Sequence, residues 1–472
     1  MNRNTTNINH ITDEGKLRIW QQNINRSLIA QQDLLNMLGN NNYDICAIQE
    51  PYLDSMNKTR ANSHWTVIYP TTHMVEPKKT RSVILVNKKL STDKWEELDV
   101  DSGDVTGIRI KTDTNTIDAF NIYNNQDNNE AIEKTDEALR RNGNQNLDNQ
   151  YIWLGNFNRH HPLWDEERNS HLFTELNLRL AQTLLDAIQE WGLQMILPKD
   201  IPTLQAFGTG NYTRPDNVFC SAQLADHLVY CNTEPSRKPT NTDHLPIITI
   251  WDLEVLKISM APRPNYQATD WEVFREKLRP RLRRKRTPDT IATTVEFHEY
   301  LEHIDNAIQD TITEVVPVTK PCPHAKRWWN DDLSSMRKKL NRLERESYRW
   351  RTHSWHPVHE EAKNLQRKYA ASIQKTKTNH WCQWLEELNE QTVWEASKMA
   401  KGPPSDGRRA RVPNLKGKLR GEDEETIARD NSTKAKLFFE EFFPKPPEDD
   451  NRQESLQGAA RWAGQSISKS QI

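Results

Sequence analysis

The chain has 472 residues, of which 35% are hydrophobic and 28% charged, and its formal net charge at pH 7 is −2. This length suffices for two or three domains, and the first 250 residues or so can enclose one large core. No stretch approaches the roughly 20 apolar residues of a membrane-spanning helix, and the polar N-terminus lacks the apolar core of a signal peptide, which argues against membrane insertion and export.

The cysteines are odd in number and widely spaced, without a C-x-x-C pair, which is typical of reduced thiols in an intracellular protein. They are Cys46, Cys220, Cys231, Cys322 and Cys382.

Charge is distributed unevenly along the chain. Residues 1–250 contain 24 Lys and Arg against 32 Asp and Glu, residues 251–420 contain 33 against 23, and residues 421–472 contain 7 against 11. A basic segment beside an acidic one suggests a polyanion that is held by the first and cut by the second. The alternative is that the basic segment is simply a solvated helical surface.

The first half of the chain alternates short strand-like runs with loops and two helical patterns. Each run has four to eight residues rich in Val, Ile, Tyr and Trp. The strands are expected at residues 17–24, 43–50, 65–70, 82–87, 105–110, 117–123, 151–157, 216–221 and 245–250. Apolar residues at helical spacing predict helices at 27–40 and 171–193, the second with Gly192 as its C-cap. Many strands with helices outside them indicate a layered α/β sandwich.

The second half reads differently. We expect a linker at 257–269 and helices at 270–283, 290–315, 331–352 and 358–390, with Asn330 or Asp331 capping the third. Tryptophans crowd this region, and they form either the core of a small helical bundle or a surface that stacks on the bases of single-stranded nucleic acid. They are Trp328, Trp329, Trp350, Trp355, Trp381, Trp384 and Trp394.

The predicted domains follow from these patterns. Residues 1–16 are expected to be a disordered tail and residues 17–256 to form the α/β domain. Residues 257–269 are the linker and 270–400 a basic, Trp-rich helical connector. Residues 401–472, rich in Pro and charge, are expected to be mostly disordered.

Candidate catalytic residues follow the predicted strands, where a rigid scaffold positions side chains accurately. Glu50 closes an apolar run and can anchor Mg²⁺, which takes one or two carboxylates plus waters and phosphate oxygens. Asn23 ends the first strand and can bind a metal-bound water or phosphate, although Asn at a strand end is more often a turn former. Tyr123 can donate its phenol to a phosphate oxygen or simply pack.

The segment Gly155-Asn156-Phe157-Asn158 is the most specific of these motifs. Gly155 lets the backbone turn tightly, the next residue should act on an attacking water, and Asn158 can bind phosphate oxygens as charge develops. The pair His160-His161 that follows either touches the scissile strand or closes the loop.

Downstream, Asp216 and the pair Asp243-His244 supply an acid and a histidine. An Asp bonded to a His fixes its tautomer and stabilises the imidazolium, which can then stabilise the pentacovalent centre or assist the leaving oxygen. We expect Asp216 to orient His244 and Asp243 to lie near the metal.

The ordered set Gln49-Glu50, GNFN, RPDNVFCS and TDHLPI resembles the endonuclease/exonuclease/phosphatase superfamily. Within it, the segments WTVIYPTTH, GNFNRHHPLW and GNYTRPDNVFCS are similar to the apurinic-type endonuclease domain of LINE-like (non-LTR) retrotransposons, especially fungal ones. The match covers residues 17–250 in detail, and residues 260–415 are similar to the connector that precedes reverse transcriptase in those polyproteins. No Asp-Asp polymerase motif appears before Ile472, so we expect an element truncated before its reverse transcriptase.

The resemblance implies a four-layer α/β sandwich, two packed mixed β-sheets flanked by helices, followed by an all-α basic extension. It implies a hydrolase of phosphodiester bonds that nicks DNA with Mg²⁺, or alternatively Mn²⁺, and needs no small-molecule cofactor. Glu50, Asn23 and Asp243 become metal ligands, Tyr123 and Asn158 phosphate contacts, and Asp216 the partner of His244.

The implied partners are DNA and, in addition, retroelement RNA; a membrane is not among them. The residues expected to contact nucleic acid are His160, His161, Arg159, Arg214, Arg283, Arg284, Lys285 and Arg286. The basic run 278–286 is also a candidate nuclear-import signal, so we expect an intracellular, nuclear location; its alternative is a solvated helix end.

Asn156 departs from the resemblance, because the family has Asp at this position to activate or align water. An amide cannot accept a proton at neutral pH, so loss of a general base here should lower the rate by roughly 10²- to 10⁴-fold. Pro215 is a second departure, because Pro inside a strand removes a ladder hydrogen bond unless the strand is at an edge.

Three hypotheses remain open from the sequence. The chain is a metal-dependent DNA endonuclease weakened by Asn156, a catalytically impaired relic that binds nucleic acid through its basic helices, or a phosphoesterase of lipid or inositol phosphates. Fold-level kinship alone does not decide between them.

Overall fold

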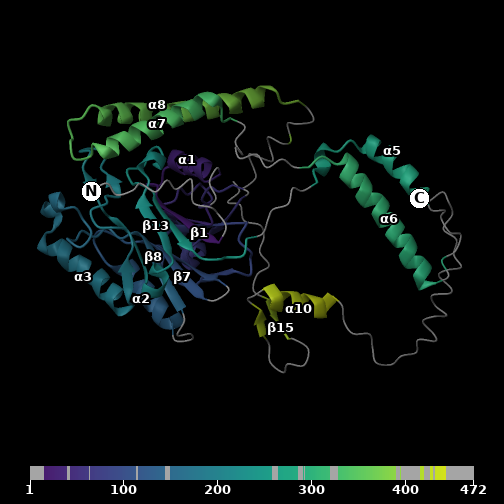
Figure 1. The fold of residues 1–472 in the computed structure, drawn as a ribbon, viewed down its shortest axis with the longest axis horizontal. Helices are drawn as coiled ribbons and strands as arrows, with labels where there is room; N and C mark the ends of the chain where they lie inside the picture. Colours follow the sequence, from purple (N-terminus) through teal and green to yellow (C-terminus); the bar gives the residue numbers. More distant parts are fainter. Residues whose placement is uncertain are drawn as a thin grey trace. The chain divides into compact units, whose positions relative to one another are not determined.

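The computed structural model describes residues 15–39, 43–62, 64–112, 115–143, 149–257, 264–284, 291, 293–318, 328–389, 394, 415–418, 426–428 and 431–442. The chain divides into residues 1–408 and 409–472, which are treated separately here. Figure 1 shows the first part built around two β-sheets. No helix among the described residues is long and apolar enough to cross a membrane. Cys46, Cys220, Cys231 and Cys382 are free thiols, and Cys322 lies outside the described residues.

The first sheet has six strands in the order β13-β14-β1-β2-β4-β3. β1 is parallel to β2 and antiparallel to β14, so the sheet is mixed. The strands are β1 (Lys16–Asn23), β2 (Ile45–Gln49), β3 (Trp65–Ile68), β4 (Ser82–Asn87), β13 (Leu228–Thr233) and β14 (Ile247–Asp252).

The second sheet also has six strands, in the order β5-β6-β7-β8-β12-β9. β7 is parallel to β8, and β12 is antiparallel to β8. The strands are β5 (Trp95–Leu98), β6 (Val105–Lys111), β7 (Thr116–Tyr123), β8 (Asn149–Asn156), β9 (Leu193–Met195) and β12 (Asp216–Ser221).

Alternation along each strand explains why the two sheets pack face to face. Ile19 and Ala47 point to the core between the sheets, whereas their neighbours Trp20 and Ile48 point to the other face. Successive strand side chains point to opposite faces, so a strand with apolar residues on both is buried on both. The outer face of the first sheet packs on α1 (Leu28–Gly39). The outer face of the second packs on α2 (Glu130–Gly143) and α3 (Glu175–Glu190). The predicted four-layer sandwich is confirmed.

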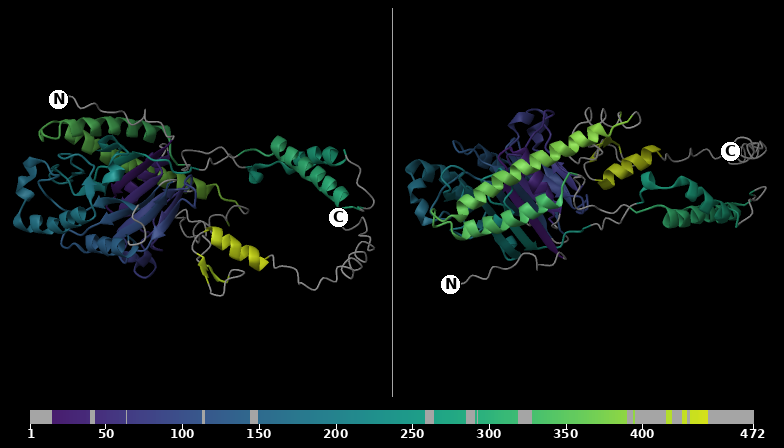
Figure 2. Two further views of the ribbon diagram at one scale, coloured as in Figure 1. Left: turned by 60° about the horizontal axis from the view of Figure 1, so that its bottom comes forward. Right: turned by 90° about the horizontal axis from the view of Figure 1, so that it is seen from above.

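The helices of the second half lie where the sequence predicts them, with slightly shorter bounds. They are α5 (Trp271–Leu282), α6 (Thr294–Val315), α7 (Asp331–Arg349) and α8 (Val358–Glu386). The side chain of Asn330 caps α7 by accepting a hydrogen bond from Leu333 N at 2.9 Å. Helices α7 and α8 run side by side, as both views of Figure 2 show.

Helices α7 and α8 pack on the sandwich through a buried polar cluster centred on Asp33 of α1. Asp33 accepts hydrogen bonds from Arg337 Nη1 at 3.1 Å, from Tyr369 OH at 3.1 Å and from Thr240 N at 3.0 Å. Arg337 also donates to Lys238 O at 3.0 Å. The helical pair is therefore bonded to the segment that leads into Asp243-His244.

The tryptophans do not form one bundle core. Trp328 and Trp329 pack on the small core of Leu333, Leu340, Tyr369 and Ile373. In contrast, Trp350, Trp355, Trp381 and Trp394 are exposed. Of these tryptophans, only Trp328 and Trp329 fit the prediction that they form the core of a helical bundle.

In the second part of the chain, the described residues form a hairpin of β15 (Leu415–Gly417) and β16 (Thr426–Ala428) and helix α10 (Asn431–Phe442). These elements fall within the segment expected to be mostly disordered. Residues 443–472 lie outside the described residues.

Candidate active site

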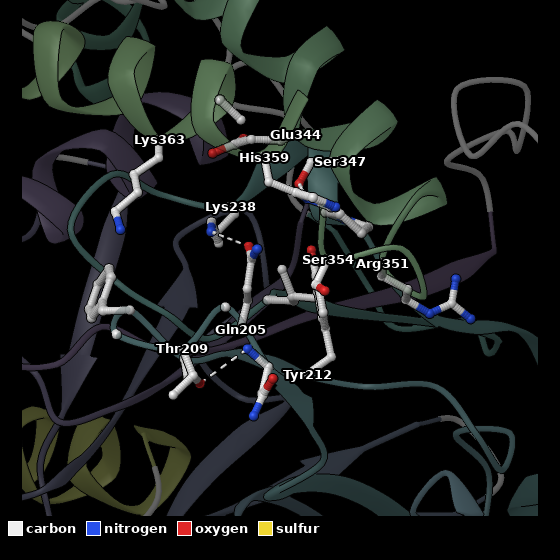
Figure 3. A pocket seen from close by; sticks show the side chains of 18 of the residues that line it. Gln205, Thr209, Tyr212, Lys238, Glu344, Ser347, Arg351, Ser354, His359 and Lys363 are labelled. Atoms are coloured by element: carbon white, nitrogen blue, oxygen red, sulfur yellow. Dashed lines mark hydrogen bonds between the residues drawn. The ribbon is translucent and has the colours of Figure 1, made fainter. Parts of the chain in front are cut away.

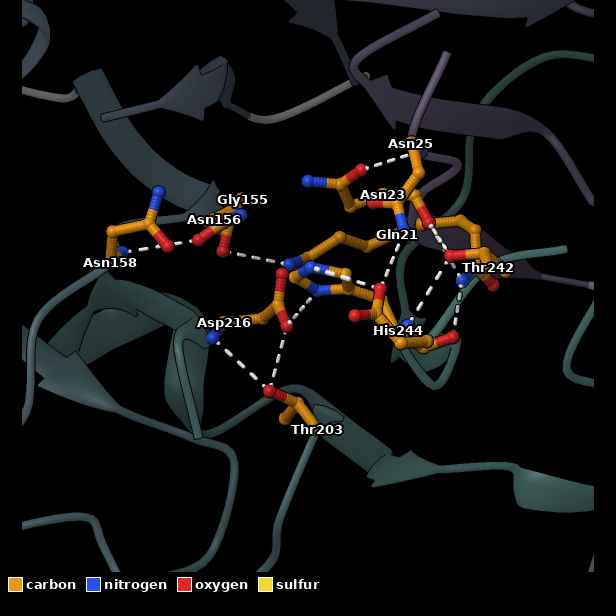
Figure 4. A network of polar contacts seen from close by, with 12 residues as sticks. Gln21, Asn23, Asn25, Gly155, Asn156, Asn158, Thr203, Asp216, Thr242 and His244 are labelled. Atoms are coloured by element: carbon orange, nitrogen blue, oxygen red, sulfur yellow. Dashed lines mark hydrogen bonds and ion pairs between the residues drawn. The ribbon is translucent and has the colours of Figure 1, made fainter. Parts of the chain in front are cut away.

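The predicted residues meet at one edge of the sandwich because strand directions bring them there. Strands β1, β2, β7 and β8 end at this edge, and β12 and β14 begin there. Figure 4 shows side chains from both sheets converging across the gap between them. Gln21 Nε2 of β1 donates to Gly155 O of β8 at 2.9 Å, which ties the two sheets together beside the site.

Asp216 and His244 form the centre of this network. His244 Nδ1 lies 2.8 Å from Asp216 Oδ2, and Thr203 Oγ1 donates to the same oxygen at 2.7 Å. The backbone N of Asp216 donates to Thr203 Oγ1 at 3.1 Å. Both side chains of the pair are buried. With Nδ1 bonded to a carboxylate, Nε2 is the imidazole nitrogen left to act on a substrate.

The surroundings of His244 favour its charged form. Burial opposes the imidazolium, but Asp216, by its charge and its hydrogen bond, and then Asp243 and Glu50 outweigh burial, so the pKa of His244 is raised. The influence of Glu50 and Asp243 shows that both carboxylates lie within electrostatic range of the imidazole.

Gly155 is required by the close pairing of β8 with β7, in which it lies opposite Ile122. Its φ is +147°, and a Cβ there would lie 1.9 Å from Ile122 O. Only glycine fits such a close backbone approach.

The loop after Gly155 holds the two asparagines. Asn156 Oδ1 accepts from Asn158 N at 3.1 Å, and Asn158 Nδ2 donates to Asn124 O at 2.7 Å. Asn158 has a φ of +50°, a conformation that Asn tolerates better than most residues. Asn156 stands directly opposite Asp216 in the β8–β12 register.

Pro215 does not interrupt the hydrogen bonding between β12 and its neighbouring strands. It precedes β12, and its carbonyl accepts from Phe157 N at 2.9 Å and from Asn158 N at 3.2 Å. The concern that this Pro weakens a strand therefore does not apply, because it lies outside the paired residues.

Glu50 occupies a turn after β2 with a φ of +46°, in the left-handed region where a Glu is strained. Its side chain is partly exposed, and Arg26 Nε lies 4.0 Å from Oε1. Burial raises the pKa of Tyr123, and Glu50 raises it further by its charge and by a side-chain hydrogen bond. Glu50 and Tyr123, from different sheets, are thus neighbours.

These residues fit a magnesium ion with few protein ligands. Among the residues described, no three His, Cys, Asp or Glu side chains form a metal-binding group. Mg²⁺ does not need such a group, because it keeps several waters and binds one or two carboxylates plus substrate phosphate. Glu50 is the available anchor. Asp216 Oδ1, which is buried without a hydrogen-bond partner, adds unbalanced negative character to the same edge.

Asn23 and Asp243 lie beside each other through the turn after β1. Asn23 Oδ1 accepts from Asn25 N at 2.9 Å, and Asn25 Nδ2 donates to Asp243 Oδ1 at 2.5 Å. Thr242 Oγ1 donates to Asn23 O at 2.7 Å. Asp243 Oδ1 is 3.9 Å from His244 Nε2, so Asp243 faces the reactive side of the imidazole.

Two of the expected nucleic-acid contacts must be corrected. Arg159 and Arg214 are only 2% and 1% exposed. Arg214 donates to Leu197 O and Asn217 Oδ1, and Arg159 to Asn129 Oδ1 and Asn158 O. Their guanidinium groups are used to tie loops together, because buried donors must be satisfied, and they do not reach a ligand.

The remaining expected contacts fall into three kinds. His161 closes its loop: its Nδ1 accepts from Leu163 N at 3.2 Å, and burial lowers its pKa. His160 is partly exposed and lies 3.3 Å from Asp165 Oδ2. Arg283 and Arg284 are exposed at the end of α5, whereas Lys285 and Arg286 lie outside the described residues.

A polar pocket adjoins the site. It has a volume of about 570 Å³ and lies between the hairpin of β10 (Leu204–Gln205) and β11 (Tyr212–Thr213) and helices α7 and α8. Figure 3 shows Lys238, Glu344 and Lys363 around it. Burial raises the pKa of Glu344 to about 7, and neither carboxylate oxygen has a hydrogen-bond partner. Gln205 N donates to Asp243 O at 2.8 Å, so the hairpin forms a wall of both the pocket and the site.

Sequence reasoning missed the residues that hold the predicted ones in place. Thr203 donates a hydrogen bond to Asp216, and Thr242 donates one to the Asn23 carbonyl. The Asn124 carbonyl accepts a hydrogen bond from Asn158, and Asn124 N donates to Asn156 O at 2.7 Å. A Thr or Asn in a loop carries no local signal for this role, because the partner is distant in sequence.

Comparison with known proteins finds one family model and several solved structures that are similar to this chain. Residues 117–248 match a family model described as endonuclease-reverse transcriptase. The endonuclease domain of TRAS1, a telomere-specific non-LTR retrotransposon, is similar at 20% identity and a TM-score of 0.39, covering 50% of this chain and 99% of that one. The AP endonuclease LMAP from Leishmania major is similar at 12% identity and a TM-score of 0.44, covering 52% of this chain and 91% of that one. An AP endonuclease from Archaeoglobus fulgidus is similar at 20% identity and a TM-score of 0.38, covering 50% of this chain and 100% of that one.

No curated protein matches the chain. The family model lies across β7, β8, β12 and the start of β14, which carry Tyr123, Asn156, Asp216 and His244. Residues 117–248 therefore carry the match to the endonuclease-reverse transcriptase family model, and they include the buried Asp216–His244 pair.

Proposed function

We propose that this chain is a divalent-metal-dependent nuclease that nicks one strand of DNA and that Asn156 makes it slow. The observation that carries the proposal is the buried Asp216–His244 pair at 2.8 Å, at the edge where Glu50, Tyr123 and Asn158 also end up. A charged imidazole, a carboxylate anchor and amide donors are the groups that hydrolysis of a phosphodiester requires.

Each residue has a distinct role in this proposal. His244, charged because of Asp216, donates from Nε2 to a phosphate oxygen and stabilises the charge that builds up in the transition state. Asn158 and Tyr123 donate to other phosphate oxygens. Glu50, with Asn23 and Asp243, would hold Mg²⁺, which supplies Lewis-acid polarisation of the phosphate and lowers the pKa of water.

Asn156 lacks the group that would take a proton from the attacking water. Its Oδ1 can accept a hydrogen bond from water and orient it, but it cannot carry the proton away. Position 156 already uses Oδ1 to accept from Asn158 N, and a carboxylate could do the same. Asn156→Asp should therefore keep the loop conformation and restore the missing base.

Nicking of supercoiled plasmid in Mg²⁺ tests the proposal. Wild type should relax plasmid slowly, and Asn156→Asp at least tenfold faster. The double variant Asn156→Asp/His244→Asn is the matched control, because it must lose the gain if the activity belongs to this site. Equal rates for wild type and Asn156→Asp would refute a base at this position, and a gain that survives in the double variant would point to a contaminating nuclease.

A second candidate function is binding of nucleic acid through the helical region, with nicking lost. It is supported by the 33 Lys and Arg against 23 Asp and Glu in residues 251–420 and by the exposed tryptophans there. Binding that falls steeply with salt, in the absence of divalent metal, tests it.

A further inference from the structure

A stripe of cationic side chains runs along one face of α7. Lys338, Arg342, Arg345 and Arg349 follow one another at intervals of four, three and four residues, which places them on one face of a helix. All four are exposed. They span twelve residues, or about 16 Å along the helix axis.

The stripe has almost no ion-pair partners within the part of the chain that the structure describes. Among the described residues, no ion pair involves Lys338, Arg342 or Arg349, and the side chain of Arg345 makes one long contact, 3.4 Å from Nη2 to Ser236 Oγ. Arg140 of α2, by contrast, is paired with Asp136 and Glu190. Unpaired arginines side by side repel one another, so an anion at this face would relieve a cost that the free protein bears.

The end of the stripe borders a groove with aromatic walls. The groove has a volume of about 630 Å³ and is lined by Arg342, Arg345, Glu346, Arg349, Trp350 and His353. Glu346 is its one acidic residue. Trp350 is 38% exposed and stacks on His356 with ring centroids 4.3 Å apart and planes 11° from parallel. His353 meets Trp350 edge-on at 5.4 Å.

The turn beyond α7 extends the aromatic surface. Trp355 is 76% exposed and lies 5.8 Å from His353, also edge-on. Flat rings that are held by neighbouring rings lose little entropy when a base stacks on them, and stacking does not depend on base identity.

We propose that this face, made of Lys338, Arg342, Arg345, Arg349, Trp350 and His353, binds single-stranded nucleic acid. The arginines pair with phosphates, and the exposed rings take unstacked bases. A duplex fits less well, because its bases are stacked on each other and cannot reach Trp350. The inference deepens the second candidate function by naming the surface and the kind of strand, and it places the contact on α7 instead of on the basic run 278–286.

Binding is measured with the full chain in EDTA, so that nicking cannot contribute. Fluorescently labelled dT20, rU20 and a 20-base-pair duplex are titrated by anisotropy at several salt concentrations. The DNA and RNA strands show whether the sugar matters, and the duplex tests the preference for single strands.

The test variant is Arg342→Gln/Arg349→Gln. The control is Arg367→Gln/Lys368→Gln, which removes two exposed charges from α8, outside the groove. Because each phosphate contact contributes about −0.7 to the slope of log K against log salt for single strands, the test variant should flatten that slope by roughly 1.4. The control should leave it nearly unchanged. Trp350→Ala should weaken binding of dT20 about tenfold with the slope preserved.

The outcomes separate the two ideas. If wild type binds no strand at low salt, the second candidate function fails. If wild type binds steeply but the test and control variants lose equal slope, nucleic acid binds elsewhere and this surface is refuted. Tighter binding of the duplex than of dT20 and rU20 would also overturn the inference. Circular dichroism of each variant confirms that the helices are intact.

Discussion

Asp216 Oδ2 accepts from two partners at once, His244 Nδ1 at 2.8 Å and Thr203 Oγ1 at 2.7 Å. This single oxygen atom therefore links the start of β12 to the loop that contains Thr203 and to the segment before β14 that contains His244. The other oxygen, Oδ1, is buried without a partner. The charge of Asp216 is therefore directed to His244, and it is the strongest influence that favours the imidazolium.

Asp216→Asn should lower the pKa of His244, because it removes the charge that offsets burial. In the wild type, the pKa of His244 is raised above its unfolded value, so the pair stabilises the fold fully below about pH 6.5 and loses this contribution as pH rises through the folded pKa. An NMR titration of the His244 ring in both proteins measures the change. Asp243→Asn is the control and should have a smaller effect, since Asp243 lies 3.9 Å from Nε2. Equal shifts from both variants would contradict the special role of Asp216.

Asn156→Asp should destabilise the metal-free protein. Positions 156 and 216 are direct cross-strand partners, and like charges facing each other cost about 0.5 to 1 kcal/mol. Adding Mg²⁺ should restore most of the lost stability, because a cation shields the added carboxylate. Urea unfolding with EDTA and with Mg²⁺ measures both steps. A variant as stable as wild type in EDTA and indifferent to Mg²⁺ would show that the new carboxylate faces neither Asp216 nor a cation.

Glu344→Gln should stabilise the protein at alkaline pH. Burial raises the pKa of Glu344 from 4.5 to about 7, so the folded state holds a proton that the unfolded state releases, and stability falls as pH rises from about 4.5 to 7. Above pH 7 the full cost is roughly 3 kcal/mol, and the neutral amide avoids it. Urea unfolding at pH 5 and pH 8 should show a gain at pH 8 and little change at pH 5. Glu346→Gln, on the more exposed side of α7, is the control and should show no such pH dependence.

Arg337→Met should destabilise the chain strongly, because it leaves Asp33 buried without its cation. Removing one partner of a buried ion pair costs about 3 to 5 kcal/mol. Tyr369→Phe removes only one hydrogen bond to Asp33 and should cost about 1 kcal/mol. Denaturation of both variants measures the difference. If Arg337→Met matches Tyr369→Phe, the helical pair is held by apolar contacts and not by the Asp33 cluster.

The sequence predicted long, strongly apolar elements and missed short or polar ones. β4 and β7 stand out because β-branched residues dominate them, whereas β5, with the sequence WEEL, has too few apolar residues to be recognised. Helix α2 was missed for the same reason, since five of its first eight residues are charged. β13 was missed because only one of its six positions, Cys231, is an apolar residue that the fold buries.

The candidate site shows the same division between motif and context. The motifs marked Glu50, Asn156, Asp216 and His244 because acids and amides after apolar runs are unusual and chemically meaningful. Arg159 and Arg214 looked equally suitable for a phosphate, yet both are buried and bonded to carbonyl and amide oxygens. A charged residue in a loop does not reveal from its neighbours whether it points outward or inward.

The sequence alone predicted the layered α/β class, which the structure confirms, and proposed the reactive groups, including an amide where the resemblance implies a carboxylate. These follow from side-chain chemistry and from the alternation of apolar residues along a strand, both of which are local. Only the tertiary structure decided that Asp216 meets His244, that Thr203 holds Asp216, and that α7 and α8 are bonded through Asp33 to the segment before His244. Such contacts depend on strand order and sheet packing, which bring together residues as much as 336 positions apart.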